Sequence, residues 1–163
     1  MPTNNTDFYL GNPNLKKVGT DINFTSEQIQ EYLKCKEDPV YFAMNYIKII
    51  SLDEGIVPFK MWDFQQELIE SFHENRFNIA KLPRQTGKST TCVSYLLHYV
   101  LFNDNVNVGI LANKLSTARD LLGRLQLAYE QLPMWMQQGI ITYNKGSMEL
   151  ENGSKILAAS TSA

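Results

Sequence analysis

Apolar residues that recur every three or four positions mark the clearest elements along the chain. Over 88–102 they fill every position of the i, i+3, i+4, i+7, i+8 template: Val93, Leu96, Leu97, Val100 and Leu101. A second repeat runs over 114–132 and ends before Pro133: Leu115, Ala118, Leu121, Leu122, Leu125 and Ala128. Such a repeat places the apolar side chains on one face of an α-helix. The pattern therefore predicts two amphipathic helices, each with one buried face.

Three further helices are predicted in the first half of the chain. Thr25 precedes Gln28 by three residues, which is the capping-box signal for a helix that starts after Thr25. Asp38 followed by Pro39 gives the same kind of signal for a second helix. Over 61–76 one helical face carries four apolar residues: Phe64, Leu68, Ile69 and Phe72.

Short apolar runs bounded by turn residues predict the strands. Two of them, 77–82 and 105–112, alternate with the helices in the middle of the chain. Three more short strands are expected after residue 138, where Asn144-Lys145-Gly146 and Asn152-Gly153 supply the turns. The alternation of strands and helices predicts an α/β fold with a parallel sheet flanked by helices, and the last three strands are expected to pair antiparallel at one edge.

The segments nearer the N-terminus are less regular. Residues 1–24 are rich in Asn, Thr, Gly and Pro, lack periodicity, and are interpreted as an extended, partly mobile arm. Residues 48–52 predict a strand that ends in a turn at 53–55. The domain itself is therefore expected to span 25–163, which is long enough for one hydrophobic core.

Composition and charge change this picture only a little. Of the 163 residues, 44% are hydrophobic and 20% charged, as is ordinary for a globular protein. A net charge of −2 gives no overall basic field for nucleic acid, although a local basic stripe is compatible with that total. Cys35 and Cys92 lie in no metal-ligand or redox spacing. No apolar run approaches the length of a membrane span, so no membrane partner is expected.

The stretch LPRQTGKST at 82–90 carries the candidate chemistry. Its Gly87-Lys88-Ser89 matches the end of the phosphate-binding consensus G-x-x-x-x-G-K-[ST], but Leu82 stands where the first glycine belongs. A predicted strand precedes the loop and a predicted helix follows it, as that consensus requires. A chance Gly-Lys-Ser at a helix start is the alternative, and the flanking elements favour the phosphate loop.

The residue types in this loop suit a nucleotide phosphate. Backbone N–H groups of 85–89 can bind phosphate oxygens at a helix N-terminus, and Gly87 lets the backbone come close. The Lys88 ammonium can reach the β- and γ-phosphates, and the Ser89 hydroxyl can hold Mg²⁺. The expected nucleotide-binding residues are these: Gln65, Arg84, Gln85, Thr86, Gly87, Lys88, Ser89 and Thr90.

Arg84 and Gln65 each have two interpretations. A guanidinium at Arg84 lies within reach of a γ-phosphate and can stabilise charge during its transfer, or else Arg84 is a solvated loop arginine. The amide of Gln65, in the helix predicted before the loop, can pair with the adenine edge, or else it is a surface glutamine. The residues alone leave both alternatives open.

Several stretches together resemble one family. DPVYFAMNYI, PFKMWDFQQEL, LPRQTGKST, VGILANK and WMQQGIITYNKGSMELENGSKI are similar to the ATPase domain of the large terminase subunit of tailed bacteriophages, of the myovirus type. The resemblance runs from the N-terminal arm to the last residue. A loop that lacks the first glycine is characteristic of that family, so Leu82 is expected there.

The resemblance implies the ATPase motor subunit that packages double-stranded DNA into the procapsid, in a full-length protein that is also an endonuclease. It assigns catalysis to Arg84 and Lys88, Mg²⁺ binding to Ser89 and adenine recognition to Gln65. ATP and Mg²⁺ are the implied cofactors. The implied partners are double-stranded DNA, the phage portal protein and the small terminase subunit, in the cytoplasm of the infected bacterium.

The resemblance also implies parts that are missing from this sequence. A Walker B strand ending in Asp-Glu is expected beyond residue 163, and a nuclease domain after it. The chain is therefore interpreted as the N-terminal portion of a P-loop ATPase domain, truncated before the Walker B strand. Another P-loop DNA translocase or helicase, and a nucleotide-binding module that does not hydrolyse ATP, are the alternatives.

Overall fold

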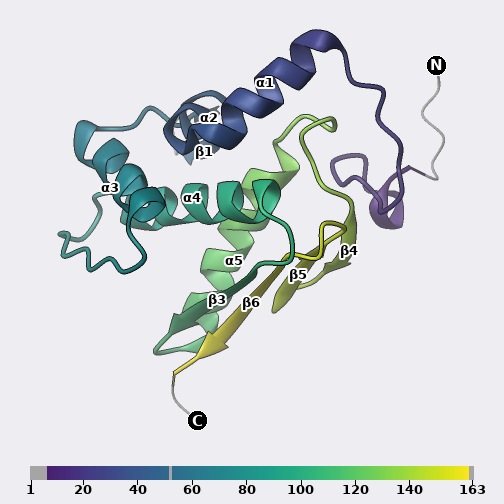
Figure 1. Cartoon of the computed structure of the whole chain (residues 1–163). Coiled ribbons are helices and arrows are strands. Elements are labelled where there is room, and N and C mark those ends of the chain that lie inside the picture. Colours follow the sequence, from purple (N-terminus) through teal and green to yellow (C-terminus); the bar gives the residue numbers. More distant parts are fainter. Residues whose placement is uncertain (1–6, 52, 162–163) are drawn as a thin grey trace.

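The computed structural model describes residues 7–51 and 53–161 as a mixed α/β fold (Figure 1). The helices of this part are α1 (Ser26–Glu37), α2 (Pro39–Tyr46), α3 (Asp63–Glu74), α4 (Lys88–Phe102) and α5 (Leu115–Glu130), with a short 3₁₀ helix η1 (Tyr9–Gly11) before them. The strands are β1 (Lys48–Ser51), β2 (Gly55–Pro58), β3 (Asn107–Ala112), β4 (Ile140–Tyr143), β5 (Ser147–Leu150) and β6 (Lys155–Ser160). None of these helices is long and apolar enough to cross a membrane.

The main sheet has four strands in the order β3-β6-β5-β4. β3 and β6 pair in parallel, with Asn107 opposite Lys155, whereas β4, β5 and β6 pair antiparallel. The two tight turns that join the last three strands fall where Asn-Lys-Gly and Asn-Gly were expected to place them. α5 packs on β3 and β6 and also against α4 (Figure 1). The α/β class and the antiparallel C-terminal segment are therefore confirmed.

The prediction of a strand at 77–82 is wrong. These residues have no regular secondary structure, and the side chains of Phe77 and Ile79 are 83% and 101% exposed. A strand is stable only when a neighbour satisfies its backbone N–H and C=O groups, and no strand of the described part pairs with this segment. The parallel partner of β3 is β6 instead. The P-loop type of parallel sheet, with a strand leading into the loop, is thus not confirmed.

The helix boundaries follow their capping residues. The Gln28 N–H donates to Thr25 Oγ1 at 3.2 Å, and the Thr25 N–H donates to Gln28 Oε1 at 3.0 Å, which completes the predicted capping box. The Tyr41 N–H donates to Asp38 Oδ1 at 2.8 Å at the start of α2. α4 spans the residues predicted for it, and its apolar face is buried against α2 and α5.

A cluster of aromatic rings joins α2 to α4. Phe42 is fully buried and its ring lies 5.5 Å from the rings of both His98 and Phe102, edge to face. His98 is 2% exposed, and its Nε2–H donates to the Cys35 carbonyl at 2.9 Å. Because only a neutral imidazole is inexpensive to bury, this packing requires the uncharged form of His98.

Acid is expected to destabilise the fold through His98. Burial lowers the pKa of His98 to about 4, below its ordinary value of 6.5. Between these values only the unfolded chain takes up the proton, so stability falls as the pH drops from 6.5 towards 4, by about 1.4 kcal/mol per pH unit at most. Urea unfolding at pH 7 and pH 5 measures the slope. His98→Gln should flatten it, and an unchanged slope in that variant would contradict the assignment.

The segment before α1 differs from the extended arm that was predicted. Residues 7–20 turn through η1 and dock on the sheet, where Lys17 forms a parallel bridge with Ile140, and Leu15 is 3% exposed. The Gln137 side chain accepts from the Lys16 N–H at 2.9 Å, and its Nε2 donates to the carbonyl of Asn14 and to two further carbonyls near the end of α5. The Lys16 N–H and the Gln137 side-chain oxygen find these hydrogen-bond partners only when the segment is docked, and this holds the segment in place.

Glu151 makes a second connection to this segment. Its carboxylate accepts hydrogen bonds from Gly19 N–H at 3.1 Å, Gly139 N–H at 2.6 Å and Lys16 Nζ at 3.2 Å. Burial acts to raise the pKa of Glu151, but these donors outweigh it and hold that pKa below its usual value. The carboxylate is therefore a structural anchor for residues 16–19.

Candidate functional site

The loop before α4 closes on itself through one carbonyl group. The Pro83 carbonyl accepts a hydrogen bond from Thr86 Oγ1 at 3.0 Å and another from Lys88 Nζ at 3.0 Å. The Lys88 ammonium thus spans the loop from the first turn of α4 back to the start of the loop. A cation held across a loop by a single carbonyl is easily transferred to a stronger acceptor such as a phosphate oxygen.

Two left-handed residues shape the loop. Gln85 has φ +63° and Gly87 has φ +73°, and Gly87 is the N-cap of α4. No backbone N–H group of residues 84–90 donates a hydrogen bond to any residue of the described part. The N–H groups of the loop and of the first turn of α4 are therefore available to an anion at the positive end of the helix.

Gln65 fastens the loop to α3. Its Oε1 accepts from the Trp62 N–H at 2.9 Å, and its Nε2 donates to the Thr86 carbonyl at 3.1 Å. The residue is only 3% exposed, so it is not a surface glutamine. The predicted apolar face of this helix is correspondingly displaced, since Gln65 and Ile69 are buried while Phe64 is 36% exposed. The amide that was expected to read adenine is engaged in binding the protein backbone.

An open pocket of about 490 Å³ lies against the loop. Residues of β1, the end of the β1–β2 hairpin, α3, the loop and α4 line it: Ile49, Phe59, Lys60, Trp62, Phe64, Gln65, Gln85, Thr86, Gly87 and Thr90. None of them is acidic. The walls are aromatic and aliphatic on one side and backbone-rich on the other, which is the usual composition of a small-molecule site.

The structure brings together most of the residues expected to bind nucleotide. Five of them line the pocket: Gln65, Gln85, Thr86, Gly87 and Thr90. Lys88 and Ser89 are half-buried in the first turn of α4, next to the free N–H groups. Arg84 is exposed and contacts no partner among the described residues, so its two interpretations both remain.

The aromatic wall of the pocket was missed in the sequence. Trp62, Phe59 and Ile49 were not expected at the site, because the strand pair β1–β2 that carries Ile49 towards the loop was only half predicted. β2 (Gly55–Pro58) was not expected at all, although the turn before it was. A tryptophan three residues before Gln65, at the start of an amphipathic helix, was the available signal.

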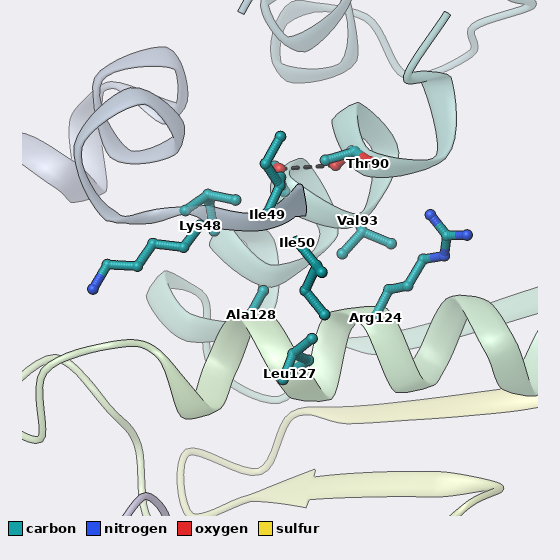
Figure 2. A pocket seen from close by; sticks show the side chains of 10 residues that line it. Lys48, Ile49, Ile50, Thr90, Val93, Arg124, Leu127 and Ala128 are labelled. Carbon is teal, nitrogen blue, oxygen red and sulfur yellow. Dashed lines mark hydrogen bonds between the residues drawn. The ribbon is translucent and has the colours of Figure 1, made fainter. Parts of the chain in front are cut away.

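A second pocket, of about 410 Å³, shares Ile49 and Thr90 with the first and lies between β1, α4 and α5. Figure 2 shows Ile50 and Leu127 facing each other across it, while the charged ends of Lys48 and Arg124 point away on opposite sides. No polar groups converge in this space. The pocket beside the loop is therefore the better candidate for a ligand that carries charge.

Burial disfavours the thiolate form of Cys92, the thiol nearest the loop. Cys92 lies one helical turn after Lys88 and is half-buried. Burial raises the pKa of Cys92, although the nearby Lys88 charge acts in the opposite direction. The described part also contains no group of three or more His, Cys, Asp or Glu residues that could hold a metal ion. Ser89 is the one predicted metal ligand, and it supplies a single hydroxyl oxygen.

Gly87→Ala is expected to destabilise the loop by about 1–2 kcal/mol, because an L-residue is strained in the left-handed region. An added Cβ would also lie 2.5 Å from Gln65 Nε2 and displace its bond to Thr86. Chemical unfolding measures the change. Gly123→Ala in α5 is the matched control, since its Cβ would meet nothing within 4 Å, and it should be neutral or stabilising. Equal effects at the two glycines would contradict the loop geometry.

A scan of the chain against models of known protein families found no match.

Proposed function

We propose that the loop 83–90 binds the phosphates of ATP, and that the chain is the nucleotide-binding part of a large terminase subunit. The observation that carries the proposal is the loop itself: free N–H groups at the N-terminus of α4, with Lys88 held in place across them. The adjoining pocket supplies room for the rest of a nucleotide. The terminase resemblance of LPRQTGKST and its flanking stretches supports ATP as the ligand.

In this proposal Lys88 exchanges the Pro83 carbonyl for phosphate oxygens. Backbone N–H groups of 85–90 surround the same oxygens, and the helix dipole of α4 favours their negative charge. Mg²⁺ fits the site only in part, because Ser89 supplies one oxygen and ligand phosphates supply others, as is usual for this ion. Bound there, Mg²⁺ would neutralise charge on the phosphates.

ATP binding to Lys88→Ala tests the proposal. Loss of a charged hydrogen bond should weaken the affinity by about 10- to 100-fold in isothermal titration calorimetry with Mg·ATP. Lys145→Ala, an exposed lysine in the β4–β5 turn, is the control and should bind like the parent chain. Equal affinities of the parent chain and Lys88→Ala would overturn the proposed role of the loop.

Hydrolysis by this chain is expected to be very slow. A carboxylate that positions or activates the attacking water contributes about 10²- to 10⁴-fold in rate, and no residue lining the pocket is acidic. Phosphate release at saturating ATP measures the rate. Turnover of about 1 s⁻¹ or faster, an ordinary value for an enzyme, would show that the described residues already contain the complete catalytic set.

The wider terminase roles extend from the same proposal. DNA packaging, DNA cutting, and contact with double-stranded DNA, the portal protein and the small subunit in the host cytoplasm are inferred from the resemblance. Binding of nucleotide without turnover is the second candidate, and the absence of acidic residues from the pocket lining favours it for the described part.

A further inference from the structure

We propose that the pocket beside the loop holds the base of a nucleotide stacked on Trp62, and that Gln65 positions the loop instead of reading the base. This inference rests on the proposed binding of nucleotide phosphates by the loop. It names the part of the site that binds the base, and it gives Gln65 a role other than the adenine recognition expected of it.

Trp62 is the most exposed aromatic residue of the pocket. Its side chain is 72% exposed although it is the largest apolar group there, while Phe59, which also lines the pocket, is 4% exposed. Trp62 is the N-cap of α3, and its backbone N–H is fixed by Gln65. The ring is thus carried by an anchored backbone next to the loop, where a flat ligand can cover it.

The aromatic side chains and the loop border one pocket. Gln65 joins the Trp62 backbone to the Thr86 backbone through a single side chain. The backbone that carries the Trp62 ring and the backbone of the loop are therefore joined through one side chain, and residues of both line the same pocket. A base with its ribose and phosphates spans such a site, whereas inorganic phosphate would occupy only the loop.

Gln65 is poorly placed to read a base edge. One oxygen lone pair and one N–H of its amide are already used, and the residue is 3% exposed. Turning the amide towards a base would release the Thr86 carbonyl and the Trp62 N–H together. Stacking tolerates every base because each has a π-face. The site is therefore expected to discriminate weakly between ATP and GTP, with affinities within about threefold of each other.

The test compares three probes: ATP, GTP and inorganic tripolyphosphate. Trp62→Ala should weaken the binding of ATP and GTP by roughly 5- to 100-fold, because the base loses its stacking partner. The affinity for tripolyphosphate, which has no base, should stay unchanged. Trp62→Phe should recover most of the affinity. Gln65→Ala should weaken the binding of all three probes by the same factor of about 3 to 10, since the loop loses the hydrogen bond that fastens it to α3. Calorimetry and circular dichroism of each variant give the affinities and confirm folding.

Tryptophan fluorescence gives an independent readout. Trp62 emission should be quenched by ATP but not by tripolyphosphate, and Trp135→Phe removes the other tryptophan, which packs against Tyr46 at 6.0 Å between ring centroids. If Trp62→Ala binds ATP with the affinity of the parent chain, the stacking role is overturned. If Gln65→Ala weakens the binding of ATP but not of GTP or tripolyphosphate, Gln65 reads the base. Failure of the parent chain to bind tripolyphosphate would instead overturn phosphate binding by the loop.

Discussion

Replacement of Arg84 by alanine is expected to slow ATP hydrolysis by about 10³- to 10⁵-fold while ATP affinity stays close to that of the parent protein. In the proposed ATP site Lys88 would face phosphate oxygens that are already negative in the ground state, so its loss should affect both binding and turnover. Arg84 contacts no partner among the described residues, so its removal should leave the fold intact. In the proposed role its charge would act mainly as the γ-phosphoryl group departs, and such an interaction raises the rate without tightening binding.

The measurement is single-turnover hydrolysis and nucleotide binding, with the variant compared to its parent protein. Arg84→Lys should recover little activity, because an ammonium lacks the planar fork that spans two oxygens. Arg119→Ala, an exposed arginine of α5, is the matched control. Hydrolysis by Arg84→Ala at the parent rate would mean that Arg84 is a solvated loop residue.

Replacement of Phe42 by alanine is expected to cost about 3–5 kcal/mol of unfolding free energy, the largest stability effect proposed for this chain. Phe42 is fully buried and packs against rings of α2 and α4, including Tyr46 at 6.1 Å between centroids. Its removal leaves a cavity at the junction of the two helices. Urea unfolding followed by circular dichroism measures the loss.

The control is Phe77→Ala, which removes the same atoms from an exposed position. The ring of Phe77 is 83% exposed, and among the described residues the Arg76 guanidinium lies over it, 5.2 Å from the ring centroid. An exposed pair of this kind contributes about 0.5–1 kcal/mol, so this variant should lose no more than that. Similar losses at the two phenylalanines would show that Phe42 is not at the centre of the core.

Local signals predicted the helices well. Thr25 with Gln28 and Asp38 with Pro39 are short-range capping patterns, and the apolar repeat of α4 needs no knowledge of distant residues. The turns of the last three strands are equally local. Elements of this kind depend on neighbours within a few residues, which the sequence displays directly.

The errors arose where distant parts of the chain decide the structure. Residues 77–82 have strand-forming composition, but a strand also needs a partner, and composition does not identify one. Gln65 is buried although the apolar pattern of its helix left it outside the predicted face, and its contact there is with Thr86, a residue beyond the end of its own helix. The exposed ring of Trp62 and its place beside the loop likewise follow from how α3 meets the loop. The loop residues could be predicted as one site because they are consecutive in the sequence. The aromatic wall could not, because its residues come from separate elements of the fold.

The docking of the N-terminal segment has a consequence for the synthesis of the protein. Lys16 is bonded to Gln137, 121 residues later in the chain, and to Glu151 beyond it. A ribosome that adds about 5–20 residues per second needs roughly 6–24 s to make that interval. During this time the nascent segment has no docking site. Residues 7–20 are therefore expected to reach their final position only after Gln137 and Glu151 have left the ribosome.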